Sequence, residues 1–140
     1  MSLALFIGLL APVLAATSPL TTQTPVKNFR LPTYNEAGHR SMLIQGARAI
    51  VGADQIELTD LNLTLFTGDK AGTIETIILS PQAIAEPKSE RIHGEHAVRF
   101  IRNDLEITGE RWTYNHHEKK VSIATKTRIT FHVPLPDILK

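Results

Sequence analysis

The sequence predicts an all-β domain with about eight to ten short strands, arranged as a sandwich, jelly roll or solenoid. From Phe29 onward there is no convincing helical stretch, and short runs alternate apolar with polar residues. This period of two places the apolar side chains on one face of a strand. Thr, Ile and Val, which half-buried pleated surfaces favour, are abundant.

The alternation is clearest in four runs, at residues 61–65, 105–107, 121–123 and 129–131. Turn-forming residues separate the runs at 35–38, 67–70, 102–104 and 115–118. Near residue 60 the apolar positions change parity, because Ile56 and Leu58 are even and Leu61 is odd. A strand cannot change face without an extra residue, so Thr59-Asp60 predicts a bulge, a corner or a tight turn.

A weak repeat, Ile-x-Gly, recurs along the chain. Ile92-x-Gly94 and Ile107-x-Gly109 are offset by fifteen residues, and residues 44–46 form a third copy. A poorer fourth copy begins at Ile78. The spacing favours units that bury their apolar faces only against neighbouring units, although chance recurrence in a β-rich sequence is the alternative.

The first residues have a different composition from the rest. Residues 3–16 carry no charge, and a Thr/Ser/Pro/Gln stretch follows. The apolar run is shorter than the ~20 residues of a membrane span, so we expect a signal peptide cleaved after Ala15. A buried helix and an uncleaved short anchor are the alternatives. The predicted organisation is therefore a signal or anchor at 1–15, a flexible leader at 16–28, a β-domain at 29–133 and a tail at 134–140.

Composition excludes several function classes. Fifteen Lys and Arg against fourteen Asp and Glu give a net charge of +1, which argues against a nucleic-acid binder. The chain has no cysteine, which excludes disulfides, thiol nucleophiles and cysteine-ligated metals. No phosphate-binding loop, nucleophile elbow or zinc-protease motif occurs. We therefore predict no catalytic residue and no cofactor.

The histidines do not predict a metal site. The six are His39, His93, His96, His116, His117 and His132. Three positions is an odd step, so on a regular strand His93 and His96 point to opposite faces unless a turn intervenes. His116 and His117 fall in an expected hairpin loop, where an exposed pair is the simpler interpretation.

Three segments resemble the LptC/LptA group, the OstA-like periplasmic β-jellyroll proteins of lipopolysaccharide export. FRLPTYNEAG at 29–38 resembles the opening of LptC-like domains, and IQGARA at 44–49 follows it as in that family. LEITGERWTYN at 105–115 resembles the repeated ending of OstA-like strands. The resemblance implies an antiparallel open β-jellyroll, in which two sheets form a V-shaped trough for acyl chains.

The resemblance also implies the site and the partners. Acyl chains would contact the inward residues of the last strands: Val98, Phe100, Leu105, Ile107, Trp112, Tyr114, Val121, Ile123, Ile129 and Phe131. Arg99, Arg102 and Arg111 are candidates for meeting phosphates, or simply a solvated face. Expected partners are lipopolysaccharide, other bridge modules of this type and the inner-membrane ABC transporter complex, with edge-to-edge pairing of modules.

Several alternatives stay open at this point. The role is either that of an LptC-type tethered module or of an LptA-type periplasmic one. The alternative function is a non-catalytic secreted β-sandwich with a closed core and a structural or carbohydrate-binding role. An open apolar interior with unpaired edge strands distinguishes the first function from the second.

Overall fold

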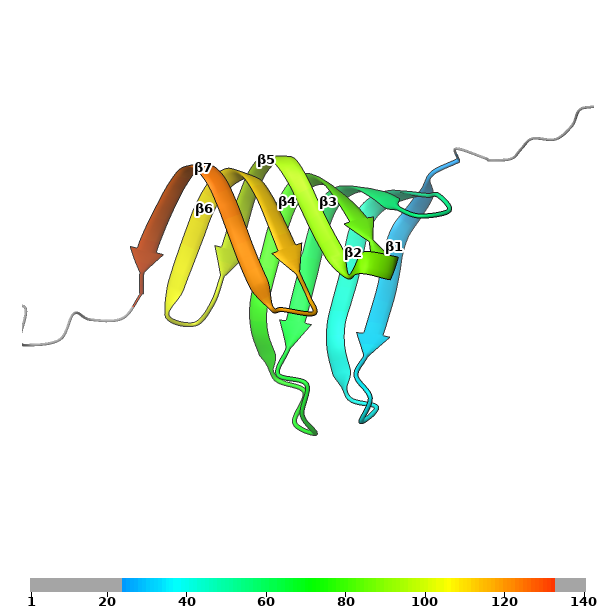
Figure 1. Cartoon of the computed structure of the whole chain (residues 1–140), viewed down its shortest axis with the longest axis horizontal. Helices are drawn as coiled ribbons and strands as arrows, with labels where there is room; N and C mark the ends of the chain where they lie inside the picture. Colours follow the sequence, from blue (N-terminus) through cyan, green and yellow to red (C-terminus); the bar gives the residue numbers. More distant parts are fainter. Residues whose placement is uncertain (1–23, 133–140) are drawn as a thin grey trace, which may run out of the picture.

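The computed structural model of the chain describes residues 24–132, which form one seven-stranded antiparallel sheet (Figure 1). The strands are β1 (Val26–Tyr34), β2 (Arg40–Val51), β3 (Ile56–Phe66), β4 (Ile74–Glu86), β5 (Arg91–Ile101), β6 (Leu105–Asn115) and β7 (Lys120–Phe131), with a short 3₁₀ helix, η1 (Pro87–Ser89), before β5. They are ordered β1 to β7 across the sheet, so each pairs only with its neighbours in sequence. This confirms the all-β prediction.

The pairing of every strand is interrupted once, near the start of β1 and closer to the middle of the others, and the interruptions line up as a crease across the sheet. Figure 1 shows the strands arching over a common crest. Hydrogen-bonded register is interrupted there in each pair, for example between Gln45↔Asn62 and Arg48↔Thr59. Four crease residues have positive φ angles: Asn28, Asp60, Arg111 and Lys126. The predicted irregularity at Thr59-Asp60 is therefore confirmed, with Asp60 at φ 56°.

The crease divides the sheet into two leaves. Leaf 1 comprises residues 26–27, 48–51, 56–59, 82–86, 91–94, 112–115 and 120–123. Leaf 2 comprises residues 29–34, 40–45, 61–66, 74–80, 97–101, 105–110 and 127–131. One hydrophobic core cluster draws on both, pairing Leu58 and Trp112 of leaf 1 with Leu63 and Ile78 of leaf 2. The core therefore lies between the leaves, which fold towards each other about the crease.

The glycines of the Ile-x-Gly repeat all border the crease. A Cβ at Gly109 would stand 3.0 Å from the Thr125 carbonyl oxygen and would collide with the Ile123 side chain. Gly46 and Gly94 are similarly crowded. The repeat is thus structural in these three copies. In each, a buried or half-buried isoleucine is followed two residues later by a glycine that borders the crease.

The structure differs from the expectation in three respects. The predicted eight to ten strands are wrong for the described residues, which form seven longer ones. The two faces of the trough are leaves of one continuous sheet, because every strand crosses the crease. The first strand begins at Val26, inside the predicted leader. The expected signal segment and the expected tail beyond residue 133 lie outside the described residues.

Candidate functional site

An apolar row crosses the inner face of leaf 2 from one edge of the sheet to the other. Each member is paired in register with the next: Leu31, Ile44, Leu63, Ile78, Phe100, Ile107 and Ile129. A row with one apolar side chain from every strand follows from the period of two in all seven strands. It forms one wall of the interior along the whole width of the sheet.

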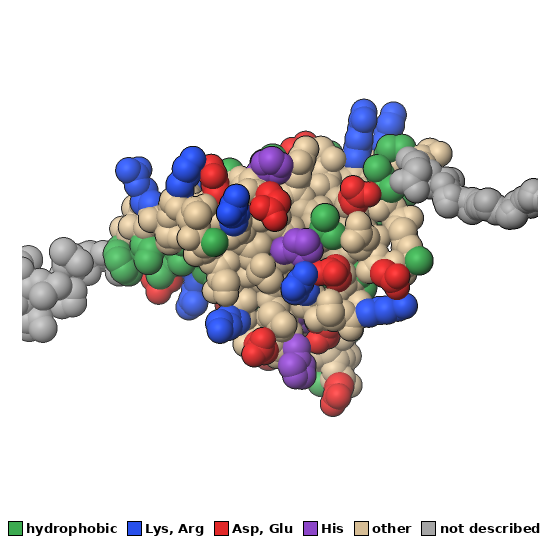
Figure 2. Space-filling model, turned by 45° about the horizontal axis from the view of Figure 1, so that its top comes forward, with side chains coloured by type: hydrophobic (Ala, Val, Ile, Leu, Met, Phe, Trp, Pro, Cys, Tyr) green, Lys and Arg blue, Asp and Glu red, His purple; other side chains and the backbone are tan. Residues whose placement is uncertain are grey.

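Burial along this row falls towards β7. Leu63 and Ile78 are fully buried, at 0% exposure, whereas Phe100 and Ile107 are half-buried. At the β7 edge Ile129 is 51% exposed, and its neighbour on the same face, Phe131, is 61% exposed. Hydrophobic side chains gather at this end of the molecule in Figure 2. The interior is therefore sealed at its centre and open at the β7 end.

The opposite wall is a second row on leaf 1. It runs through Val51, Ile56, Ala85, Ile92, Tyr114 and Val121, which are also paired in register. Trp112, 1% exposed, lies nearer the crease beside Ile123. Its indole N–H has no hydrogen-bond partner within residues 24–132. The two walls together make an apolar interior that carries no charged side chain in either row.

All ten residues predicted for acyl-chain contact lie on the inner face by register. Val98, Trp112 and Tyr114 are buried in the core, at 1–2% exposure. Five others are half-buried, namely Phe100, Leu105, Ile107, Val121 and Ile123. Ile129 and Phe131, in the leaf 2 part of β7, are more than half exposed. Sequence patterning did not reveal Leu31 or Ile44, which extend the same wall to β1.

The three arginines suggested for phosphate contact do not face the interior. Arg99 lies on the outer face of leaf 2, where its Nε donates to Glu106 Oε1 at 2.8 Å. Arg102 lies in the β5–β6 turn, 3.7 Å from Asp104. Arg111 occupies the crease, 67% exposed, 3.7 Å from Glu95. All three therefore belong to the solvated outer surface.

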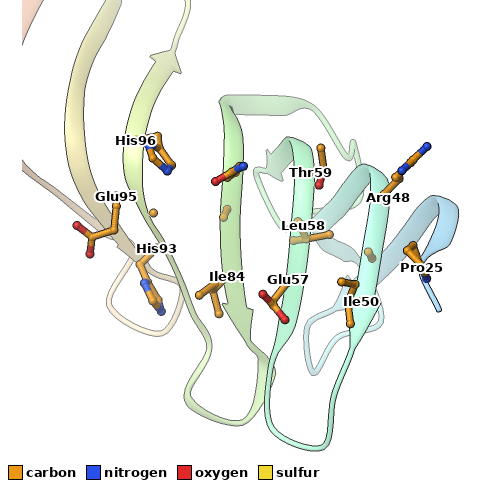
Figure 3. A pocket seen from close by; sticks show the side chains of 14 residues that line it. Pro25, Arg48, Ile50, Glu57, Leu58, Thr59, Ile84, His93, Glu95 and His96 are labelled. Carbon is orange, nitrogen blue, oxygen red and sulfur yellow. The ribbon is translucent and has the colours of Figure 1, made fainter. Parts of the chain in front are cut away.

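A second concavity crosses the outer face of leaf 1. Its volume is about 440 Å³. Figure 3 shows Ile50, Glu57, Ile84 and His93, consecutive partners across β2–β5, on its wall. His96 lines the same pocket, because β5 is unpaired from β4 over the crease. The odd-step rule for a regular strand does not apply to His93 and His96, because the crease falls between them.

The two leaves are joined at the mouth, the side of the interior opposite the crease. His116 Nε2 lies 2.6 Å from Ser41 Oγ, and its Nδ1 lies 2.9 Å from the Tyr114 hydroxyl. Its backbone N–H donates to the Glu90 carbonyl at 2.8 Å. The prediction of an exposed histidine pair holds for His117, whose side chain is 83% exposed, but is wrong for half-buried His116.

Burial keeps this chain of three side chains uncharged. It lowers the pKa of His116 below its ordinary value; the Glu90 carboxylate opposes that shift and Lys119 adds to it. Burial also raises the pKa of Tyr114, with Glu75 and Glu90 acting in the same direction. A neutral imidazole donates through one nitrogen and accepts through the other, and a hydroxyl can do either. Both bonds can therefore form at neutral pH.

The described residues offer an apolar interior in which a ligand could bind. Within residues 24–132, no three His, Cys, Asp or Glu side chains are grouped closely enough to hold a metal ion. The same part of the chain contains no helix with the length and hydropathy needed to cross a membrane. The large feature is the apolar interior, open at one end and bordered by two edge strands.

Comparison with known proteins agrees with this architecture. No curated protein matches the chain. The family model described as lipopolysaccharide-assembly, LptC-related, matches residues 13–132. That match spans the whole creased sheet. The chain therefore belongs to the LptC-related family of envelope-associated proteins, with a role in lipopolysaccharide transport.

Proposed function

We propose that the chain is a non-enzymatic module that binds lipopolysaccharide, taking its acyl chains between the leaves at the β5–β7 end. The observation that carries this proposal is the apolar row of leaf 2, which passes from a sealed centre to Ile129 at an exposed edge. Each buried methylene contributes ~0.8 kcal/mol, so an apolar wall holds lipid without any reacting group. The sugars of the bound molecule remain in water.

The edges of the sheet support a bridging role. β1 and β7 are each paired on one side only among the described strands. An unpaired edge offers a row of backbone N–H and C=O groups to an added strand. We propose that modules of this type, and the inner-membrane transporter complex, dock at these two edges, and that lipid passes along the shared interior.

We also propose that the protein is located in the periplasm. Residues 3–16 would direct export, with cleavage after Ala15 or retention as a short anchor. Mass spectrometry of the protein recovered from the periplasmic and membrane fractions distinguishes these two forms. Recovery from the cytoplasm alone would contradict export.

Photo-crosslinking in cells tests lipid binding. A photoreactive residue is placed at Ile107 or Ile129 on the inner face, with Glu106 and Thr130 as matched outer neighbours on the same strands. We expect lipopolysaccharide adducts at the two inner positions and a several-fold lower yield at the outer ones. Equal yields from both faces, or adducts from the outer positions only, would contradict binding between the leaves and favour a closed structural or carbohydrate-binding module.

A further inference from the structure

The hydrogen bond between Ser41 and His116 joins strands that are far apart in the sheet. Ser41 lies on β2, and His116 follows β6, four strand positions away. At the usual strand spacing of ~4.8 Å, that separation is ~19 Å along the sheet. A contact of 2.6 Å is possible only across the interior, from the margin of leaf 2 to the margin of leaf 1. The bond therefore closes the mouth at this position.

A small cavity lies beside this contact, and the exposed residues Pro87, Glu90 and Arg91 form part of its rim. It has a volume of about 180 Å³, and its walls include Leu31, Met42 and Ile44 of leaf 2 and Ile92 of leaf 1. These are apolar side chains from both walls of the interior, at the end opposite the exposed β7 edge. The cavity is thus a continuation of the apolar interior towards β1.

A surface pocket of about 280 Å³ lies in front of the contact, lined by Ser41, His116 and the β1–β2 turn. Thr33 and Glu90 line both this surface pocket and the cavity described above. The surface pocket and the cavity are therefore adjacent. Ser41 and His116 line only the surface pocket.

The local structure holds both partners in place. Ser41 is the extra residue where the β1–β2 register shifts, and it is 9% exposed. Tyr114, which holds the other imidazole nitrogen, is 2% exposed and belongs to the inner row of leaf 1. Buried hydroxyl groups are costly to leave without a partner, so the closed arrangement is favoured as long as all three side chains are present.

We propose that the Ser41–His116–Tyr114 chain is a clasp that holds the two leaves together on the β1 side of the interior, and that releasing it widens the cavity beside it for an acyl chain. The identity of the ligand rests on the proposed lipid-binding function. The clasp rests only on the contacts among the three side chains. His116 is accordingly a positioning residue, because it sets the separation of the leaves and does not contact the lipid when closed.

Spin-label distances test the clasp without any lipid. The chain has no cysteine, so Glu36→Cys and Glu118→Cys place one label on each side of the mouth, both at exposed turn positions. We expect Ser41→Ala and His116→Ala to lengthen and broaden the distance distribution. Ser41→Thr, which keeps the hydroxyl, and His117→Ala, which changes the exposed neighbour, should leave it unchanged. Identical distributions in all variants would overturn the clasp.

Photo-crosslinking then tests access to the cavity. With the photoreactive residue at Leu31, we expect few lipopolysaccharide adducts in the otherwise native chain and a several-fold increase on adding Ser41→Ala. An unchanged yield at Leu31, despite widened distances and normal capture at Ile107, would overturn the role of the clasp in access. Absence of adducts at Ile107 would instead refute the proposed function, leaving the spin-label result to stand independently.

Discussion

Gly94 faces the indole of Trp112 so closely that a Cβ at position 94 would stand 2.7 Å from Nε1 and 2.8 Å from the Gln82 carbonyl oxygen. Trp112 is buried and Gln82 contributes backbone, so neither moves aside easily. We expect Gly94→Ala to lower the free energy of unfolding by about 1–3 kcal/mol, as overpacked cores do. Urea denaturation measures this.

A neighbouring substitution provides the control for that experiment. His96 lies two residues along β5 and is exposed. Since exposed positions without special contacts usually change stability by less than ~0.5 kcal/mol, His96→Ala should unfold like the native chain. Equal losses in the two variants would mean that the crowding at Gly94 is not the cause.

The left-handed conformation of Asp60 gives a second prediction. Its φ of 56° is tolerated by Asp and Gly but disfavoured for a β-branched residue. We expect Asp60→Val to be less stable than Asp60→Gly by about 1–2 kcal/mol. Thr59→Val, at the preceding exposed and extended position, should have little effect. If Asp60→Val matched Asp60→Gly in thermal denaturation, the crease would not depend on this conformation.

The exposed end of the interior allows lipid binding to be separated from folding. Ile129 is 51% exposed, so Ile129→Asp should leave the melting temperature nearly unchanged. A carboxylate on the apolar wall should nevertheless reduce lipopolysaccharide capture several-fold, because burying an unpaired charge against acyl chains is costly. Thr130→Asp adds the same charge to the outer face. A similar fall in capture for both variants would point to a general charge effect.

His116 predicts a pH dependence of stability. Burial lowers its pKa in the folded chain below the ordinary value of 6.5, so the unfolded chain takes up the proton first as pH falls. The contribution of His116 to stability is therefore fully present above pH ~6.5 and is lost as pH falls towards and through the folded pKa. The free energy of unfolding should decrease between pH 7.5 and 5, and the decrease should be smaller in His116→Gln. An equal decrease in the two proteins would assign the effect to other groups.

The crease explains why the bend near Asp60 was predicted correctly and why the number of strands was not. Parity of the apolar residues around Asp60 located one bend correctly, because β3 buries Ile56 and Leu58 before it and Leu61 after it. The same change of parity makes one bent strand resemble two short ones. The predicted number of strands was therefore too high.

Other features could not be predicted from local patterns. Arg111 and Lys126 adopt positive φ angles that carry no residue signature, unlike a glycine. The half-buried position of His116 depends on Ser41, 75 residues away in sequence. Alternation did place the ten inner residues on one face, since that depends only on neighbours along each strand. Which of them are sealed and which are open depends on how far each strand lies from the β7 edge.

Because every strand contributes to both leaves, the capacity of the interior is set by how many strands cross the crease. Each strand adds ~4.8 Å, so the six spacings between seven strands give roughly 29 Å. Insertion of one more hairpin would lengthen the interior without changing its cross-section. A module that added its own creased strand to β7 would extend both apolar walls. Two docked proteins would then share one continuous apolar interior, and the lipid could move between them without leaving it.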